Sequence, residues 1–333
     1  MANTSRAAND TVLITGAAGF IGSHTACALL NAGSRVVGVD NFDSFYPRQT
    51  KQRNLEAIAN TDASRNLFSL AELNICDKVA VLDLFERVRP RTVIHLAAKA
   101  GVRPSIADPA GYAHTNVYGT SIILDAAHRT GCERVVVASS SSVYGNCPTA
   151  PFHEGLDVNA PISPYAATKR ACELLCSTHH HLTRQPVACL RFFTVYGPRQ
   201  RPDLAIASFL GKVSRGEGLE VFGDGSTSRD YTFVSDIVAG ILAAAEKIST
   251  HGFRIWNLGN STPITLSEMI ATIERVVGKP AQVKRLAMQP GDVERTWADL
   301  TRATAELGYA PATTFENGVA AQWKAMQAAA GHS

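Results

Sequence analysis

Short runs of β-branched and apolar residues alternate with amphipathic helical stretches through the first 190 residues. The strand-like runs are residues 11–16, 35–40, 92–98, 134–140 and 187–193. The helical stretches between them are residues 21–32, 77–88, 116–130 and 164–181. Because near-continuous apolar strands that alternate with helices form βαβ units, the pattern predicts a buried parallel sheet. We therefore expect an α/β fold, a Rossmann-type doubly wound parallel sheet.

The regular alternation ends near residue 190. Beyond it, glycine and proline recur in the stretches YGPRQRPD and FGDGSTSRD, and short helices and strands alternate irregularly. This change predicts that residues 10–190 form the sheet domain and residues 191–333 mainly a smaller substrate-binding lobe. We expect part of 234–262 to pack back on the first domain and residues 1–9 to be a flexible tail.

Composition and charge narrow the class of partner. The chain has 333 residues, 45% of them hydrophobic, and its 32 basic and 29 acidic residues give a formal net charge of +3. So small and dispersed an excess argues against a nucleic-acid or membrane surface, and we expect small-molecule partners. The first residues lack an apolar signal core, no run of about 18 apolar residues follows, and the seven cysteines show no paired short spacing. These features predict a cytoplasmic protein with reduced thiols.

Two clusters look like metal sites but are better explained by the helix that carries them. Cys172 and Cys176 lie one helical turn apart, yet no second pair of ligands accompanies them. The run from His179 to His181 ends the same predicted helix, where cations interact favourably with the helix dipole. We therefore expect no metal.

The first strand runs directly into a glycine-rich turn, GAAGFIG, that opens a helix. Small residues let the backbone approach a pyrophosphate, and the free N–H groups of a helix N-terminus favour its negative charge. Asp40 ends the next strand, where an acid accepts a hydrogen bond from a ribose hydroxyl and repels a 2′-phosphate. The arrangement predicts an NAD-binding domain with NAD rather than NADP. The expected contacts from these segments are Gly16, Gly19, Phe20, Ile21, Gly22, Asp40 and Asn41.

Two further segments carry candidate catalytic groups. The run SSSSVYG, from Ser139 to Gly145, lies at the carboxyl end of a predicted strand, where ligands of an open α/β sheet bind. Tyr165 and Lys169 lie one turn apart on the face of the following helix. A phenol serves as a base at neutral pH only where a neighbouring cation stabilises its anion, and an ammonium at this spacing can do so. The pattern therefore predicts a joint catalytic role for Tyr165 and Lys169.

From Thr11 to its end the chain resembles the extended short-chain dehydrogenases, and among them the nucleotide-sugar epimerases and dehydratases. The resemblance rests on TGAAGFIG, HLAAKAGVRPS, SSSSVYG, YAATK, RFFTVYGP, GDGSTSRDYTFV and QPGDV. It implies that Tyr165 is the catalytic base, that Lys169 binds the ribose and assists the base, and that Ser140 bonds the sugar's O4. It also implies cofactor contacts at Asn74, Ile75, Leu96, Ala97, Ala98, Lys99, Tyr165 and Lys169, and a structural role for Asn116.

Two positions depart from the pattern of the family. Many relatives carry Asp-Ile where this chain has Asn74-Ile75, so the implied adenine contact is an amide rather than an acid. UDP-glucose epimerases often carry an arginine where this chain has Gln289, which weakens the transfer of their phosphate contacts.

The serine run decides which reaction the resemblance implies. Related sugar 4,6-dehydratases carry Asp and Glu in the two positions where this chain has Ser141 and Ser142, and UDP-glucuronate decarboxylases carry a glutamate at the second. Without these acids the resemblance implies neither elimination at carbon 6 nor decarboxylation. What remains is oxidation at carbon 4, rotation of the bound ketose and return of the hydride, a redox-neutral 4-epimerisation.

The substrate is expected to be a UDP-hexuronate or a UDP-hexose. RFFTVYGP, RPD and QPGDV look most like UDP-glucuronate 4-epimerases, and Thr194 with Arg201, Ser141 and Ser142 would suit a carboxylate. This favours UDP-glucuronate, with UDP-glucose as the alternative because Arg201 could also hold phosphate or uracil. The remaining expected substrate contacts are Arg103, Arg229, which resembles a diphosphate-binding arginine, and Asp292, which resembles a ribose-binding acid.

Two other functions stay open from the sequence: an NAD or metabolite sensor without catalysis, and an NAD-dependent sugar dehydrogenase that releases NADH at each turnover. The presence of Ser140, Tyr165 and Lys169 disfavours a sensor, and Asp40 disfavours the reductases that prefer NADP. The resemblance also implies a homodimer formed through the helices at 116–130 and 164–181.

Overall fold

The computed structural model describes residues 11–45, 47–62, 64–287 and 294–330, and these form two units. Unit 1 contains the chain up to Gly145, Asp157–Arg191 and Val238–Trp256. Unit 2 contains Asn146–Leu156, Phe192–Ile237 and the chain from Asn257 onward. The chain therefore crosses from one unit to the other several times.

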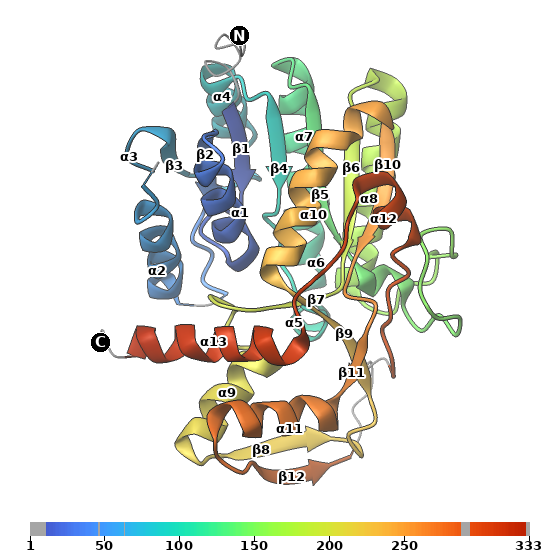
Figure 1. Ribbon diagram of the computed structural model, residues 1–333. Helices are drawn as coiled ribbons and strands as arrows, with labels where there is room; N and C mark the ends of the chain where they lie inside the picture. The colour runs from blue at the N-terminus through green and yellow to red at the C-terminus, as the bar shows by residue number, and fades with distance from the viewer. Residues whose placement is uncertain (1–10, 46, 63, 288–293, 331–333) are drawn as a thin grey trace. The chain divides into compact units, whose positions relative to one another are not determined.

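The sheet of unit 1 has seven strands in the order β10-β6-β5-β4-β1-β2-β3 (Figure 1). They are β1 (Thr11–Thr15), β2 (Arg35–Asp40), β3 (Phe68–Glu72), β4 (Thr92–His95), β5 (Arg134–Ser140), β6 (Val187–Phe192) and β10 (Phe253–Leu258). β1 pairs in parallel with β2 on one side and with β4 on the other, so the strand order reverses at β1. The predicted doubly wound α/β fold is confirmed. The reversal marks the carboxyl ends of β1 and β4 as the expected ligand position.

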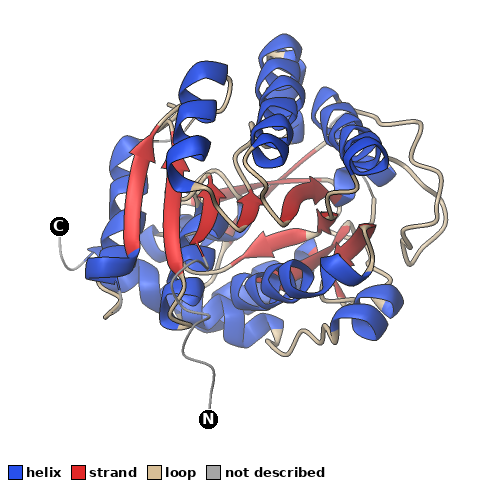
Figure 2. Ribbon diagram, turned by 90° about the horizontal axis from the view of Figure 1, so that it is seen from above, coloured by secondary structure: helices blue, strands red, loops and turns tan. Residues whose placement is uncertain are grey.

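Helices cover both faces of this sheet (Figure 2). They are α1 (Phe20–Asn31), α2 (Arg48–Ala59), α3 (Ser64–Leu67), α4 (Lys78–Val88), α5 (Val102–Ala107), α6 (Pro109–Tyr112), α7 (Gly119–Arg129), α8 (Pro164–Thr183) and α10 (Val234–Lys247), with a π-helical turn at Ala113–Tyr118 and 3-10 turns at Ser141–Tyr144 and Ile248–Thr250. On one face α7 packs against both α4 and α8, while α1 packs against α2. This sandwich explains why the central strands are apolar throughout.

The core of unit 1 lies between the sheet and these helices. The strand side chains with no exposed surface include Leu13, Ile14, Val36, Val93, Ile94, Val135 and Leu190. Phe85 of α4 and Ile123 of α7 form one cluster with Leu13, Val93 and Val135. Burial of each such side chain contributes about 1.5–3 kcal/mol to folding, so this core fixes the strand ends that carry the candidate site.

Local signals set the start of α8, the helix with the candidate catalytic residues. Ser163 is the N-cap, and its hydroxyl accepts a hydrogen bond from the N–H of Ala166 at 3.1 Å. Pro164 occupies the first helical position, where a missing N–H costs nothing. The predicted helix 164–181 is therefore found almost as expected, ending at Thr183.

Three elements differ from the sequence prediction for physical reasons. α2 was not predicted because its buried face is partly polar: Lys51 and Asn54 are buried beside Ile58. β3 was not predicted because this edge strand is mostly exposed. The expected helix 116–130 starts earlier, as a π-helical turn whose Asn116 side chain bonds the backbone of Lys99.

Unit 2 is a mixed α/β body with two small sheets, ordered β11-β9-β7 and β12-β8. Its strands are β7 (Thr194–Tyr196), β8 (Gly218–Phe222), β9 (Ser228–Phe233), β11 (Pro263–Thr265) and β12 (Gln282–Leu286), and its helices are α9 (Ala205–Arg215), α11 (Leu266–Val277), α12 (Thr301–Leu307) and α13 (Phe315–Ala330). A separate core holds it together, formed by Tyr196, Ile206, Leu210, Leu219, Met269, Ile273 and Val319. Unit 2 therefore has its own hydrophobic core.

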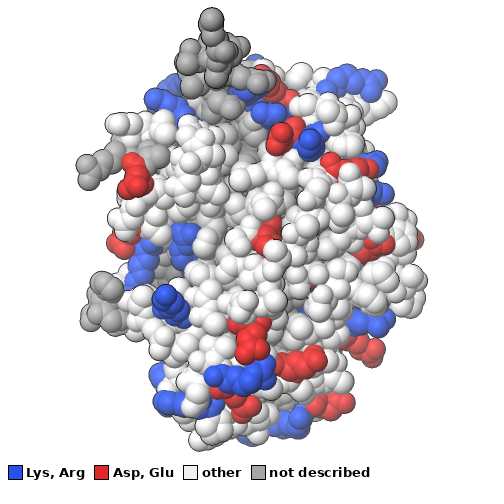
Figure 3. Space-filling view, viewed as in Figure 1, with Lys and Arg blue, Asp and Glu red and all other residues white. Residues whose placement is uncertain are grey.

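Two surface properties bear on the class of partner. Within the residues described, no helix has the length and hydropathy needed to cross a bilayer. Basic and acidic side chains are interspersed over the face shown in Figure 3, in agreement with the small net charge of +3.

A buried pair of glutamines ties α13 to the loop after β7. The Gln322 Oε1 atom accepts a hydrogen bond from Gly197 N at 2.9 Å, and its Nε2 donates to Gln200 Oε1 at 2.7 Å. Gln200 in turn donates to the Val195 carbonyl at 3.0 Å. Helix α13 thereby fixes the backbone just before Arg201.

We expect Gln322→Leu to lower the free energy of unfolding by about 1–3 kcal/mol, because it leaves buried partners of Gln322 without a hydrogen bond. Gln327→Leu, at an exposed position of the same helix, should change it by no more than about 0.5 kcal/mol. Urea titration of both variants measures the difference. Equal stabilities would show that the glutamine pair contributes nothing.

Candidate active site

The glycine turn after β1 leaves room for a close approach to its backbone. Gly16 has φ +72, and a Cβ atom there would lie 2.9 Å from the Ala97 nitrogen. A Cβ atom on Gly22 would collide with the Gly16 carbonyl. Helix α1 then starts with Gly19 as N-cap, and no side-chain hydrogen bond caps it. Its first N–H groups can therefore serve a pyrophosphate, so the turn fits a dinucleotide, as predicted.

Asp40 ends β2 beside this turn and is only 5% exposed. Its Oδ2 atom accepts from Ala18 N at 3.1 Å, and Oδ1 accepts from Phe42 N at 2.8 Å and from Lys51 Nζ at 3.0 Å. Lys51 is a residue that the sequence reasoning missed, because its helix shows no clear apolar periodicity. The cation of Lys51 offsets the charge of Asp40, so Asp40 is not an unpaired negative charge at the end of β2.

The segment after β4, which carries the next predicted cofactor contacts, is fixed to β1 and to Asn116. The Ala97 N–H donates to Thr15 Oγ1 at 3.1 Å, and Asn116 clamps the backbone of Lys99, accepting from its N–H at 2.8 Å and donating to its carbonyl at 3.0 Å. The Lys99 ammonium lies 2.9 Å from Asp108 Oδ2, and this hydrogen bond raises the pKa of Lys99. Leu96, Ala97 and Ala98 are half-buried, so the predicted contacts of this segment lie beside the end of β1.

The predicted contacts near the ends of β2 and β3 are held by local turns. Asn41 is exposed, and its Oδ1 atom accepts from Asp43 N at 3.0 Å. Asn74 is also exposed and accepts from Cys76 N at 2.9 Å. Ile75 is buried, with its side chain close to Gly119. The two amide side chains are therefore oriented by the turns that they cap.

Tyr165 and Lys169 of α8 lie against the end of β5. The Lys169 ammonium donates to the Ala138 carbonyl at 2.7 Å, and its Nζ lies 6.0 Å from the centre of the Tyr165 ring. Lys169 is 5% exposed, whereas Tyr165 is half-buried and meets the edge of the Tyr112 ring at 6.2 Å. The structure thus brings together the predicted phenol of Tyr165 and the ammonium of Lys169. The Ala138 carbonyl of β5 holds the ammonium in place.

The serine run continues from β5 into the 3-10 turn at Ser141–Tyr144. Ser140 is buried, and its hydroxyl lies 3.1 Å from Ser142 Oγ and accepts from Ser142 N at 3.2 Å. Ser141 and Ser142 are half-buried. Ser139 turns the other way, donating to Glu173 of α8 at 2.7 Å. The run therefore separates the structural hydroxyl of Ser139 from the hydrogen-bonded hydroxyls of Ser140 and Ser142.

A buried histidine that the sequence reasoning missed lies between β1 and α7. His95 Nδ1 is 2.7 Å from Thr15 Oγ1, and its Nε2 is 3.0 Å from Thr120 Oγ1. Burial, together with the charge of Lys169, lowers the pKa of His95 to about 3. The ring is therefore neutral at physiological pH and acts as a hydrogen-bonding strut, not as an acid.

Unit 2 carries the predicted substrate residues Thr194, Arg201 and Arg229. Thr194 starts β7 and is half-buried. Arg201 forms a two-point ion pair with Asp203, with N···O distances of 3.1 and 2.8 Å. Arg229 Nη1 donates to the Ser228 carbonyl at 2.9 Å, and the adjacent buried Asp230 accepts from the N–H groups of Asn260, Ser261 and Ala298 at 2.6, 2.9 and 3.0 Å. Asp292 and Gln289 lie outside the described residues, and Arg103 is exposed on α5 of unit 1.

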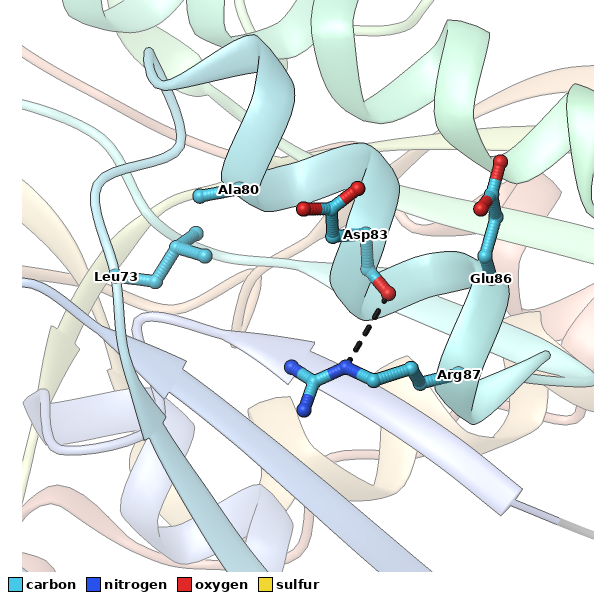
Figure 4. A pocket seen from close by; sticks show the side chains of 5 residues that line it. All are labelled: Leu73, Ala80, Asp83, Glu86 and Arg87. Atoms are coloured by element: carbon cyan, nitrogen blue, oxygen red, sulfur yellow. Dashed lines mark hydrogen bonds between the residues drawn. The ribbon is translucent and has the colours of Figure 1, made fainter.

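The histidine run at the end of α8 and a hollow on unit 1 both lie outside the candidate site. His179 and His180 bond the side chain and carbonyl of Gln185, and within the described ranges no group of three or more His, Cys, Asp or Glu residues is suited to a metal ion. A hollow of about 500 Å³ on unit 1 is lined by Leu73, Ala80, Asp83, Glu86 and Arg87 (Figure 4). None of these five is a predicted site residue.

The chain is similar to known proteins over most of its length. The family model described as GDP-mannose 4,6 dehydratase matches residues 13–322. A UDP-glucuronate 4-epimerase of Thermodesulfobacterium geofontis is 38% identical over 309 residues, which cover 92% of this chain and 93% of that protein.

Two crystal structures of 4-epimerases are similar to this chain, each covering 96% of it and 99% of the other chain. The UDP-glucuronic acid 4-epimerase of Bacillus cereus, in complex with UDP-glucuronic acid and NAD, has a TM-score of 0.88 at 34% identity. The UDP-glucose 4-epimerase of Thermotoga maritima, with UDP-glucose, has a TM-score of 0.87 at 30% identity. The chain is therefore similar to 4-epimerases of two different sugars.

The lowered pKa of His95 predicts a specific acid sensitivity. Folding requires a neutral ring, whereas the unfolded chain binds a proton near pH 6.5, so this stability is complete above pH 6.5 and is lost as pH falls toward 3. Between pH 7 and pH 5 the loss should be about 2 kcal/mol.

Urea titration at several pH values tests this dependence with two variants. His95→Gln should lose less stability than the wild type on acidification, while His181→Gln, at an exposed position, should follow the wild type. A His95→Gln profile parallel to the wild type would show that the ring titrates normally in the folded protein.

Proposed function

The chain belongs to the GDP-mannose 4,6 dehydratase family, and from that premise we propose that it inverts carbon 4 of UDP-glucuronate to give UDP-galacturonate. The chain is an NAD-dependent UDP-sugar 4-epimerase. We propose which sugar is the substrate and which role each residue has. The observation that carries it is that Ser140, which is hydrogen-bonded to Ser142, ends the same strand to which Lys169 of the Tyr165 helix is fixed through the Ala138 carbonyl.

The reaction assigned to this chain differs from the dehydration for which its family is named. Elimination of a hydroxyl from carbon 6 needs an acid and a base beyond the group that acts at carbon 4. In the resemblance those acids fall at the positions of Ser141 and Ser142, whose hydroxyls cannot supply them at neutral pH. Inversion at carbon 4 needs only the groups that remain.

Each remaining group has a separate task in the inversion. Tyr165 takes the proton of the O4 hydroxyl and later returns it, while the Ser140 hydroxyl bonds O4 and holds it in line. The Lys169 ammonium, fixed by the Ala138 carbonyl at 2.7 Å, stabilises the phenolate. NAD, when bound, would supply the hydride acceptor for carbon 4 and the hydride for the opposite face, so that the reaction is redox-neutral overall. The glycine turn and Asp40 would hold this cofactor.

The carboxylate of glucuronate is the feature that favours it over glucose. By residue type, the hydroxyls of Ser141, Ser142 and Thr194 and the guanidinium of Arg201 would suit a carboxylate. Asp203 engages Nε and Nη2 of Arg201, which orients the guanidinium plane. The 38% identity to a UDP-glucuronate 4-epimerase supports the same choice.

UDP-glucose is the second candidate. It is supported by the similarity to the Thermotoga maritima enzyme, whose structure contains UDP-glucose. The proposed proton and hydride transfers at carbon 4 are identical for both sugars, so this alternative changes the substrate and leaves the mechanism unchanged.

We also propose that the enzyme is a homodimer in which α7 and α8 meet their copies. Leu174 of α8 is 52% exposed and Tyr118, just before α7, is 45% exposed. Apolar side chains at these positions are suited to an interface.

The substrate is tested by incubating the purified enzyme with UDP-glucuronate or UDP-glucose, without added cofactor, and resolving the C4 epimers by chromatography. We expect conversion of UDP-glucuronate, with Thr194→Ala and Arg201→Lys each lowering kcat/KM for it about tenfold, the effect of losing one good polar contact of ~1.4 kcal/mol. Conversion of UDP-glucose alone would replace the proposed substrate, and conversion of neither would contradict the epimerase.

Removal of the proposed base separates chemistry from cofactor binding. Tyr165→Phe should lower kcat by at least about 100-fold, because general-base catalysis is lost, and should still copurify with NAD. Tyr309→Phe is the matched control, because Tyr309 is a buried tyrosine of unit 2 outside the proposed site and the proposed interface. If Tyr165→Phe kept its turnover, another group would be the base.

A further inference from the structure

A buried ion pair lies directly behind the serine run, and the mechanism above does not use it. Glu173 of α8 lies one helical turn beyond Lys169, and Arg191 lies near the end of β6. Both residues are 1% exposed. Arg191 donates from Nε to Glu173 Oε1 at 2.8 Å and from Nη2 to Oε2 at 2.9 Å. The pair therefore joins the catalytic helix to the sheet.

The acceptors of Glu173 are fully used. Besides the two bonds from Arg191, Oε1 accepts from the Ser139 hydroxyl at 2.7 Å, and Oε2 accepts from Arg170 Nη1 at 3.2 Å. Four donors on one carboxylate fix its position from helix, strand and serine run together.

Stability alone does not account for such a pair. Arg191 interrupts the apolar strand VACLRF, whose other residues are also buried. Taking two charges out of water costs several kcal/mol per ion, and apolar residues of similar volume often serve as well or better. The pair thus requires another reason, which its contacts with the serine run supply.

The pair contacts both ends of the serine run. At one end the Ser139 hydroxyl bonds Glu173, and at the other the guanidinium of Arg191 lies over the ring of Tyr144, 4.8 Å from its centre. The hydroxyls of Ser140, Ser141 and Ser142 are on the residues between these two contacts. Because both ends are held, the short turn between them is restricted in how it can present those hydroxyls.

We propose that Glu173 and Arg191 are positioning residues that fix the serine run on the catalytic helix, so that the Ser140 hydroxyl keeps its position beside that helix. This inference rests on the proposed roles of Ser140 and Tyr165, but it does not depend on which UDP-sugar is the substrate. A displacement of about 1 Å in a catalytic group can cost about 100-fold in rate, so the effect of losing the pair is measurable.

The first test is Glu173→Gln, which keeps the side-chain shape and removes the charge. We expect kcat for C4 inversion to fall about 10- to 100-fold, with KM and bound NAD unchanged, below the melting temperature of the variant. Amide hydrogen exchange in peptides covering residues 139–145 should become at least about tenfold faster. The control is Glu133→Gln, which breaks the Arg91–Glu133 pair of unit 1 (2.8 Å) and should leave all four quantities unchanged.

The double variant Glu173→Met with Arg191→Met distinguishes positioning from stability. It removes both buried charges, so its melting temperature should return to at least the wild-type value while kcat stays low. Recovery of kcat together with the melting temperature would overturn the proposal, because the pair would then only stabilise the fold. Unchanged kcat and unchanged exchange in Glu173→Gln would overturn it as well.

Failure of the proposed function gives a different pattern. Ser140→Ala, measured in parallel, should lose activity if the serine has its proposed role. If Ser140→Ala keeps its activity, the catalytic assignment fails while the exchange measurement still reports on the tether. If Ser140→Ala is inactive and Glu173→Gln is not, only the positioning role fails.

Discussion

The catalytic edge of unit 1 is governed by the cost of burying charge. The last residues of β1, β2, β4 and β5 are buried, so an ionised group there must have partners or it destabilises the fold. Asp40 is paired with Lys51, Glu173 with Arg191, and Lys169 with the Ala138 carbonyl. Each partner also holds its group in one place. The requirement for partners therefore produces the preorganised geometry that hydride and proton transfer need.

This constraint also explains what the sequence predicted well. The strands that carry the site are apolar on both faces. Their alternation with helices along the chain could therefore be recognised as βαβ units. Ser163 and Pro164 fix the start of α8, so the spacing of Tyr165 and Lys169 translates directly into a shared helical face. The glycine turn was readable because backbone sterics at Gly16 and Gly22 admit no side chain. Local rules sufficed for these features.

The missed residues are charged or polar groups that are buried through tertiary pairing. Lys51 and Asn54 on α2, Glu173 on α8 and Arg191 on β6 look like surface residues in the sequence, and His95 looks like a polar strand end. Their partners lie 11 to 80 positions away in the sequence, as with Lys51 and Asp40 or Thr15 and His95. No window of local sequence contains both members, so hydrophobic periodicity could not reveal them. The pairing of Arg201 with Asp203, only two residues away, is set by the loop conformation and was not readable either.

The serine run illustrates how a backbone segment can stay in place while the chemical groups that it presents are changed. Its structural anchors are Ser139 and Tyr144, while the hydroxyls offered for chemistry are on Ser140, Ser141 and Ser142. The two sets share no residue, so an exchange at 141 or 142 alters what is presented without touching what holds the segment. In a segment divided in this way, acids, hydroxyls or small residues can be exchanged at the positions between the anchors. Related enzymes that share one backbone can therefore diverge in reaction at little structural cost.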